Sequence, residues 1–110
     1  MRASKELGEV HHRLKMILGT AKFSSLSQRD VEIFATRYGL DGSYQVKTYE
    51  AVGNRHGATA EQVRLIVDNR VWPKLRELGV KQDDEWLRGE VHRVRLLRGC
   101  VGKTANSVGA

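Results

Sequence analysis

Helix-type spacing of apolar side chains is the feature of this 110-residue chain that most constrains its fold. In residues 4–18 and 83–98, apolar side chains recur every three or four positions, so each set lies along one face of a helix. The two stripes are Leu7, Val10, Leu14, Ile17 and Leu18, and Trp86, Leu87, Val91, Val94 and Leu97. Residues 40–47 favour a turn and show no alternation typical of a strand. The pattern predicts an all-α fold with an amphipathic helix near each end.

Capping signals predict where the second helix begins and ends. Ser27 followed by Asp30 resembles a capping box in which Asp replaces Glu or Gln, and Gly39 is typical of a helix end. Residues 19–20 suit the end of the first helix, and we expect Phe23 to anchor the connection between the two helices. The side chains of the second helix expected to face inward are Val31, Phe34, Ala35 and Tyr38.

Two short helices joined by a tight turn are predicted next. Residues 48–55 form a helix that begins with a threonine cap and stops at Gly57. Thr59 and Gln62 then make a T-x-x-Q capping box, which opens another helix. Pro73 must kink or end this helix, because its ring removes a backbone donor and crowds the preceding turn. The buried stripe is expected to be Val63, Ile66 and Val67.

The charge balance favours a polyanionic partner. Nineteen Lys and Arg stand against thirteen Asp and Glu, a formal charge of +6, and each phosphate that such a chain neutralises releases condensed counterions. With 40% apolar residues and no run long enough to span a bilayer, we expect one globular, cytoplasmic domain that does not enter a membrane. The N-terminus shows no secretory signal pattern.

Catalytic and cofactor-binding motifs are missing from the sequence. It contains no glycine-rich phosphate loop, no nucleophile elbow and no pair of carboxylates placed to face each other on a helix. Cys100 is the single cysteine, and the neighbouring His11 and His12 cannot converge on one metal ion without further ligands. We therefore expect a protein that is not an enzyme and that binds neither a metal nor a cofactor.

A short helix, a glycine-containing turn and a second helix with a polar start are the general pattern of a helix-turn-helix. Helical hairpins with a glycine turn also occur in proteins that never bind DNA, so the pattern alone leaves both interpretations open. Residues 26–76 add specificity, because several segments in this stretch match one family in the same order. They read "SQRD" from Ser27, "RYGLD" from Arg37, "TYEAVG" from Thr48 and "TAEQVR" from Thr59.

These segments resemble region 4 of primary-type bacterial sigma factors, in which the last two correspond to "TLEEVG" and "TRERVR". The family reads the −35 promoter element with the helix that begins at the last segment, and it docks on the flap of the RNA polymerase β subunit. The resemblance implies double-stranded DNA as a partner, and RNA polymerase core or a sigma factor as a second one. Only region 4 is matched, so we expect a stand-alone module, such as a phage or mobile-element regulator acting at the nucleoid.

The resemblance also implies roles for individual residues. Glu61 would accept a hydrogen bond from a cytosine amino group, Arg64 would meet phosphate or base, and Thr59 would donate to phosphate. Glu61 also suits the positive end of a helix dipole, which needs no DNA. Residues that would position the DNA backbone are Arg29, Arg37 and Thr48, and the predicted contact set also includes Ala60, Gln62, Leu65 and Asn69.

Departures from the family favour an altered target or an altered role. Ala60 and Gln62 stand where the family usually has Arg, and Leu65 replaces a polar base-reading residue, so the helix offers fewer donors to guanine. Asp68 also places a negative charge near the expected phosphate path. The alternative function is therefore an RNA polymerase-associated factor that binds the flap, a sigma factor or an anti-sigma factor, including antitermination-like modification, and uses the fold chiefly for protein contact.

The predicted organisation has four parts: an N-terminal helix in 1–25, a region 4-like helix-turn-helix in 26–78, a basic amphipathic helix in 79–99 and a flexible tail in 100–110. The outer helices are expected to pack on each other within one chain or across the two-fold axis of a homodimer. The accessory basic side of the last helix consists of Arg88, Arg95 and Arg98, which can follow phosphates or form an ordinary solvated face.

Overall fold

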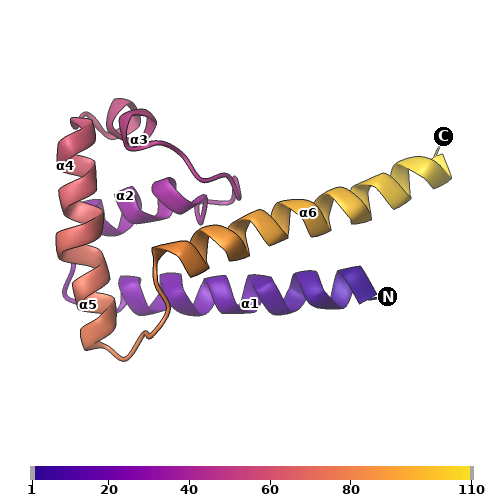
Figure 1. Cartoon of the computed structure of the whole chain (residues 1–110), viewed down its shortest axis with the longest axis horizontal. Helices are drawn as coiled ribbons and strands as arrows, with labels where there is room; N and C mark the ends of the chain where they lie inside the picture. Colours follow the sequence, from indigo (N-terminus) through magenta and orange to yellow (C-terminus); the bar gives the residue numbers. More distant parts are fainter. Residues whose placement is uncertain (1, 110) are drawn as a thin grey trace.

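A computed structural model describes residues 2–109, with the side chains of residues 5–99. Every regular element in this part of the chain is helical, which confirms the predicted all-α class. The elements are α1 (Arg2–Lys22), α2 (Gln28–Tyr38), α3 (Tyr49–His56), α4 (Ala60–Leu65), the π-helical segment η1 (Ile66–Val71), α5 (Trp72–Glu77) and α6 (Asp84–Gly109). In Figure 1, α1 and α6 run side by side in opposite directions, and the continuous helix formed by α4, η1 and α5 crosses one end of this pair.

The two long helices, α1 and α6, pack against each other within one chain. The predicted stripes face the core: Val10, Leu14 and Ile17 of α1 and Leu87, Val91 and Val94 of α6 are buried, while Leu7, Leu18, Trp86 and Leu97 are partly buried against them. Arg13 bonds Glu90 at 2.9 Å, and Arg93 lies 3.5 Å from Glu6, so two ion pairs cross between the helices. Of the two arrangements left open by the sequence, the outer helices therefore adopt the intrachain one.

The end of α1 differs from the prediction at residues 19–20. The helix continues to Lys22, because Ala21 is fully buried and gives the last turn a place in the core. Phe23 completes that turn by donating its amide to the carbonyl of Gly19 at 3.0 Å. Its side chain is 94% exposed, so the prediction that Phe23 anchors the connection is wrong; the core contact of this connection is made by Leu26.

The C-terminal end also differs, since α6 continues to Gly109 through the segment predicted as a flexible tail. The single proline of the chain is Pro73, so no proline removes a backbone donor from this segment and the helical bonding pattern can continue. The side chain of Cys100 lies outside the described residues.

Pro73 is accommodated inside a helix. The amide of Trp72 bonds the carbonyl of Val67, five residues back, so the turn before Pro73 is wider than an α-helical turn. A widened turn relieves the crowding that a proline ring causes in a helix interior. The sequence left two outcomes open at Pro73, a kink or the end of the helix. The helix does not end there. The fully buried side chains of this helix are spaced by four residues throughout, at Val63, Val67, Val71 and Leu75.

An aromatic cluster joins α2, α5 and α6. Phe34, Tyr38 and Trp72 pack with ring centroids 5.0 to 5.9 Å apart, mostly edge to face, which is a favoured arrangement for aromatic pairs. The indole of Trp72 donates to the hydroxyl of Tyr38 at 3.0 Å, and this hydroxyl donates to the carboxylate of Asp84. Burial raises the pKa of Tyr38 far above its usual value, and the hydrogen bond to Asp84 is the second cause of this rise.

We expect Tyr38→Phe to lower the free energy of unfolding by about 1–3 kcal/mol, because it leaves the buried indole of Trp72 without its acceptor. Urea unfolding followed by tryptophan fluorescence measures this change. Tyr44→Phe is the matched control: its ring stacks on His11 at 5.0 Å, and no hydrogen bond of its hydroxyl is seen among the described residues. If both variants unfold at the wild-type midpoint, the buried hydroxyl does not stabilise the fold.

Candidate nucleic-acid interface

The connection between α3 and α4 is a tight turn with a cap on each side. Thr48 accepts the amide of Ala51 at 3.1 Å, which starts α3, and Gly57 ends it in the left-handed conformation at φ 67°. Thr59 accepts the amide of Gln62 at 3.1 Å, and the Gln62 side chain accepts the amide of Thr59 at 2.9 Å. The predicted caps and the capping box are confirmed.

Gly53 allows the two helices of this unit to approach closely. A Cβ atom on Gly53 would lie 2.3 Å from the carbonyl oxygen of Ala58, and the carbonyl of Gly53 accepts the amide of Ala58 at 2.9 Å. Val52 and Val63, one from each helix, are fully buried beneath the turn. We call residues 48–65, which include α3, the turn and α4, the α3–α4 unit. The angle between its two helices depends on Gly53, because any side chain at this position would push the turn away.

Contacts from α2 hold the α3–α4 unit in place. The hydroxyl of Thr36 lies 2.9 Å from Nε2 of His56, and the buried carboxylate of Asp30 lies 3.6 Å from the guanidinium of Arg70 in η1. Sequence reasoning did not single out Arg70, because its partner lies on another helix and no local pattern links the two. Arg70 and Arg29 line a shallow groove of about 230 Å³ beside α4.

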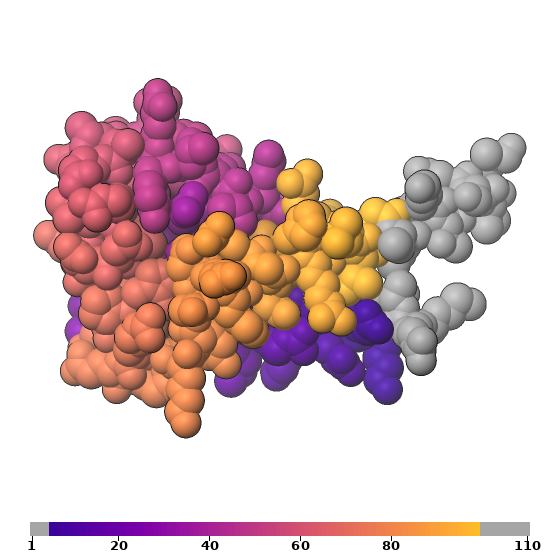
Figure 2. Space-filling model, viewed as in Figure 1, coloured from indigo at the N-terminus to yellow at the C-terminus, as the bar shows by residue number. Residues whose placement is uncertain are grey.

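The solvent-facing side of α4 and of the adjoining η1 carries half of the predicted contact residues. Ala60, Glu61, Leu65 and Asn69 are exposed and Arg64 is half-buried. Arg64 binds Glu61 through two hydrogen bonds, of 2.5 and 3.2 Å, which lower the pKa of Glu61 and raise that of Arg64. Figure 2 shows the surface of α4 uncovered along one edge of the molecule. A donor group and an acceptor group are therefore presented together on one rigid helix.

Three predicted contact residues use their polar atoms to cap helices. The oxygens of Thr48, Thr59 and Gln62 accept backbone amides, so these side chains hold the ends of α3 and α4 in shape. The Gln62 side chain also lines the groove that Arg29 and Arg70 share. Gln62 therefore contributes to the position of α4 more than to its outward face.

Arg37, a predicted contact residue, also makes contacts within the fold. Its guanidinium donates to the carbonyl of Lys47 and stacks 4.2 Å from the ring centre of Tyr49, and the side chain is half-buried. These contacts fasten the loop 39–48 to α2 and the start of α3. Part of the guanidinium is therefore used inside the fold, and a contact of Arg37 with a DNA backbone stays a prediction.

The accessory basic side of α6 divides into two parts. Arg88 is held by Asp84 at 2.8 Å, so its charge is offset by a neighbouring carboxylate. Arg95 and Arg98 instead lie beside the loop that leads into α3: both line a shallow hollow with Ser43, and Arg98 stacks 5.2 Å from the ring centre of Tyr44. Two of the three predicted arginines therefore lie next to the α3–α4 side of the molecule.

Asp41 organises the same loop. It accepts from the hydroxyl of Ser43 at 2.8 Å and lies 3.3 Å from Arg55 and 4.0 Å from Lys47. Burial opposes ionisation, but the Ser43 hydrogen bonds and the two cationic neighbours outweigh it and lower the pKa of Asp41. Sequence reasoning missed Arg55 and Lys47, although both are basic residues close to the turn.

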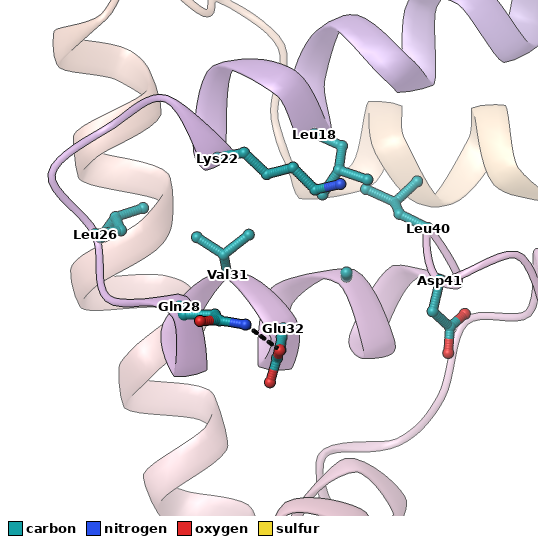
Figure 3. Close-up of a pocket in the computed structure, with 9 residues that line it drawn as sticks. Leu18, Lys22, Leu26, Gln28, Val31, Glu32, Leu40 and Asp41 are labelled. Atoms are coloured by element: carbon teal, nitrogen blue, oxygen red, sulfur yellow. Dashed lines mark hydrogen bonds between the residues drawn. The ribbon is translucent and has the colours of Figure 1, made fainter.

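A separate hollow of about 600 Å³ lies between α1, α2 and the turn after α2 (Figure 3). Its apolar walls come mainly from Leu18, Val31 and Leu40, and a hydrogen bond of 3.1 Å between Gln28 and Glu32 lies on its rim. The hollow does not include any residue of the α3–α4 unit.

Comparison of the chain with known protein families, with curated proteins and with solved structures gives no match. Among the helices described, none combines the length and the apolar character needed to cross a membrane. In the same part of the chain, no three His, Cys, Asp or Glu side chains gather as a metal site would require.

We expect Gly53→Ala to destabilise the protein by about 1–3 kcal/mol, because the new Cβ overlaps the turn backbone rather than a flexible side chain. Gly89→Ala is the control. Gly89 lies inside α6, and a Cβ atom added there would meet nothing within 4 Å, so this change should stabilise the helix by about 0.5–1 kcal/mol. Thermal unfolding of both variants measures the difference; equal stability would contradict the close approach at Gly53.

Proposed function

We propose that this protein is a DNA-binding transcription regulator whose α3–α4 unit is a helix-turn-helix, with α4 entering the major groove of promoter-type DNA. The observation that carries the proposal is the paired Glu61 and Arg64 on the exposed first turns of α4. The capping box at Thr59 and the close packing at Gly53 hold this helix in one orientation. The ordered resemblance to sigma region 4 supports the same assignment.

The chemistry of the exposed face suits direct reading of base edges. Glu61 can accept from a cytosine amino group, and Arg64 can donate to guanine or to a phosphate. Leu65, which is 40% exposed, offers an apolar surface to a thymine methyl group. Because Glu61 and Arg64 satisfy each other in the free protein, a base pair or phosphate must replace these bonds when DNA binds.

Basic side chains near α4 and near the loop that precedes α3 suit contacts to the DNA backbone. Arg29 lies in the groove beside α4, and Arg95 and Arg98 lie beside the loop. The formal charge of +6 favours the same partner through counterion release. In this proposal Arg88 contributes less, because Asp84 offsets its charge.

The second candidate function is an RNA polymerase-associated factor that uses the same fold for protein contact. The observation that supports it is the low polarity of the exposed face of α4. Ala60 and Leu65 are exposed there, and the capping box uses the side-chain oxygen of Gln62. Fewer polar groups, donors and acceptors together, then remain for base reading. Binding of the full chain to core polymerase, compared with its binding to promoter DNA, separates the two candidates.

We expect Arg64→Ala to weaken binding to all duplexes and to lower the slope of log K against log salt by about one unit, as loss of one phosphate contact requires. Glu61→Ala should instead relax the preference at one base pair, by about 1–3 kcal/mol. Fluorescence anisotropy with a preferred and a scrambled duplex at several salt concentrations measures both effects.

Arg76→Ala is the matched control for these two variants. Arg76 is an exposed arginine at the other end of the same continuous helix, so the change removes an equal charge far from the first turns of α4. It should leave the preference between the two duplexes unchanged. If Glu61→Ala and Arg64→Ala bind both duplexes as the wild type does, α4 is not the DNA-reading helix.

We expect the double variant Arg95→Gln/Arg98→Gln to lose affinity to a similar extent for every duplex and to flatten the salt dependence by up to about two units. Replacing Arg76 and Lys81 with Gln removes the same charge near the end of α5 and should have a smaller effect. Salt titrations of both double variants provide the comparison. Equal losses in the two would show that only net charge matters, and that Arg95 and Arg98 are not local phosphate contacts.

A further inference from the structure

One aromatic ring in the loop 39–48 connects this loop to both outer helices. The ring of Tyr44 stacks on the imidazole of His11 in α1, with 5.0 Å between the ring centres and 29° between the ring planes. The guanidinium of Arg98 in α6 lies 5.2 Å from the centre of the same tyrosine ring. We call these three side chains the Tyr44 stack. In Figure 1, the loop extends from α2 toward α6 before it turns into α3.

The backbone at Tyr44 is strained. Its φ of 50° lies in the left-handed region, and every other described residue with a positive φ is a glycine. A bulky side chain keeps this conformation only where the surrounding structure holds it. Two backbone hydrogen bonds close the loop: the amide of Tyr44 bonds the carbonyl of Gly39 at 2.8 Å, and the amide of Lys47 bonds that of Arg37 at 2.9 Å. The stack therefore holds a conformation that the loop would leave if the ring contacts weakened.

His11 lies where a positive charge is unfavourable. Its Nε2 atom is buried and has no hydrogen-bond partner among the described residues. Burial lowers the pKa of His11 below its usual value of 6.5, and the cations Arg98 and Lys15 are the second and third causes. An imidazolium at this position would be a buried charge without an acceptor. It would also compete with Arg98 for the same tyrosine ring.

The charged groups around His11 do not offset such a charge. Those that act on its ring are both cations, one from α6 and one from α1, and Arg95 lines the hollow beside Arg98. On α1, Glu9 and His12 are exposed to solvent. The carboxylates of the adjoining elements are paired with other cations: Glu6 with Arg93, Glu90 with Arg13, and Asp41 with Arg55 and Lys47. Protonation of His11 therefore adds a cation beside Arg98 without a carboxylate to balance it.

We propose that protonation of His11 releases the loop 39–48 from α1 and α6, so that the fold carries an acid-sensitive switch at the entrance to α3. The added charge drives the imidazole and Arg98 apart, the ring of Tyr44 loses its support, and the strained backbone relaxes. Because the loop leads directly to the Thr48 cap, its release frees the start of the α3–α4 unit from the outer helices. The proposal does not depend on whether that unit binds DNA.

The direction of the pH dependence follows from proton binding. His11 is harder to protonate while the loop is closed than when it is open, so the open form gains the proton first as the pH falls below about 6.5. The equilibrium constant for opening is constant above this pH and rises below it. At pH 5 the rise is at most about thirty-fold, which is the limit for a freely accessible histidine.

Hydrogen exchange of the full chain, followed by NMR from about pH 7.5 to about pH 5, tests the proposal. Protection factors divide out the intrinsic pH dependence of exchange, so they report the opening of the structure alone. We expect the protection of the Tyr44 and Lys47 amides to fall at least about five-fold across this range. No fall overturns the proposal. Protection equal to that of the core amides of α2 also overturns it, because the loop would then open only when the whole chain unfolds.

Two histidine variants assign the effect to one side chain. His11→Phe keeps an aromatic ring against Tyr44 but cannot be protonated, so it should abolish the fall in protection. His12→Phe is the matched control, because it removes the exposed neighbouring histidine and leaves the stack intact. It should show the same fall as the wild type. If His11→Phe retains the fall, or His12→Phe removes it, a different group controls the loop and the proposal is wrong.

Replacement of Arg98 provides a second measurement that leaves His11 in place. Arg98→Gln removes a cation that acts on the imidazole, so it should shift the pKa of His11 upward, as measured by NMR titration of the ring protons. Arg88→Gln removes the same charge elsewhere on α6 and should not shift this pKa. An unchanged pKa in Arg98→Gln, or equal shifts in the two variants, overturns the proposal.

Discussion

The hydroxyl of Tyr38 is the point on which the arrangement of the helices depends. It accepts from Trp72 on one side and donates to Asp84 on the other, so one side chain of α2 joins the long α4–α5 helix to the first turn of α6. A buried polar junction of this kind is stable only when all its members are paired. The same junction fixes α6 relative to α2, and α2 in turn contacts the α3–α4 unit through Thr36 and the adjoining η1 through Asp30.

Local sequence signals predicted a large part of the fold. Helix starts at Ser27, Thr48 and Thr59 follow from hydrogen bonds between residues only three positions apart, and such bonds need no knowledge of the tertiary structure. Apolar periodicity likewise identified the buried sides of α1 and α6, because helical geometry alone places those residues on one face. The solvent-facing position of Glu61 followed from the same reasoning.

Features that depend on distant contacts could not be predicted in this way. Arg37 reads as an ordinary basic residue, yet the carbonyl of Lys47 and the ring of Tyr49 hold it inside the fold. Phe23 reads as an anchor, but burial of Ala21 turns the end of α1 so that Phe23 faces solvent. Arg70 acquires its role from Asp30 on another helix. Each outcome is decided by packing between elements that are far apart in the sequence.

The four-residue spacing of Val63, Val67, Val71 and Leu75 has a consequence for the opposite side of that helix. In a regular α-helix, a step of four residues overshoots a full turn by about 40°, so such a stripe would wind away from the core. The wider π-helical winding offsets this drift, and the line Glu61, Leu65 and Asn69 stays straighter along the outer side as well. Pro73, by favouring that winding, therefore extends the length of helix that can lie flat against a single partner.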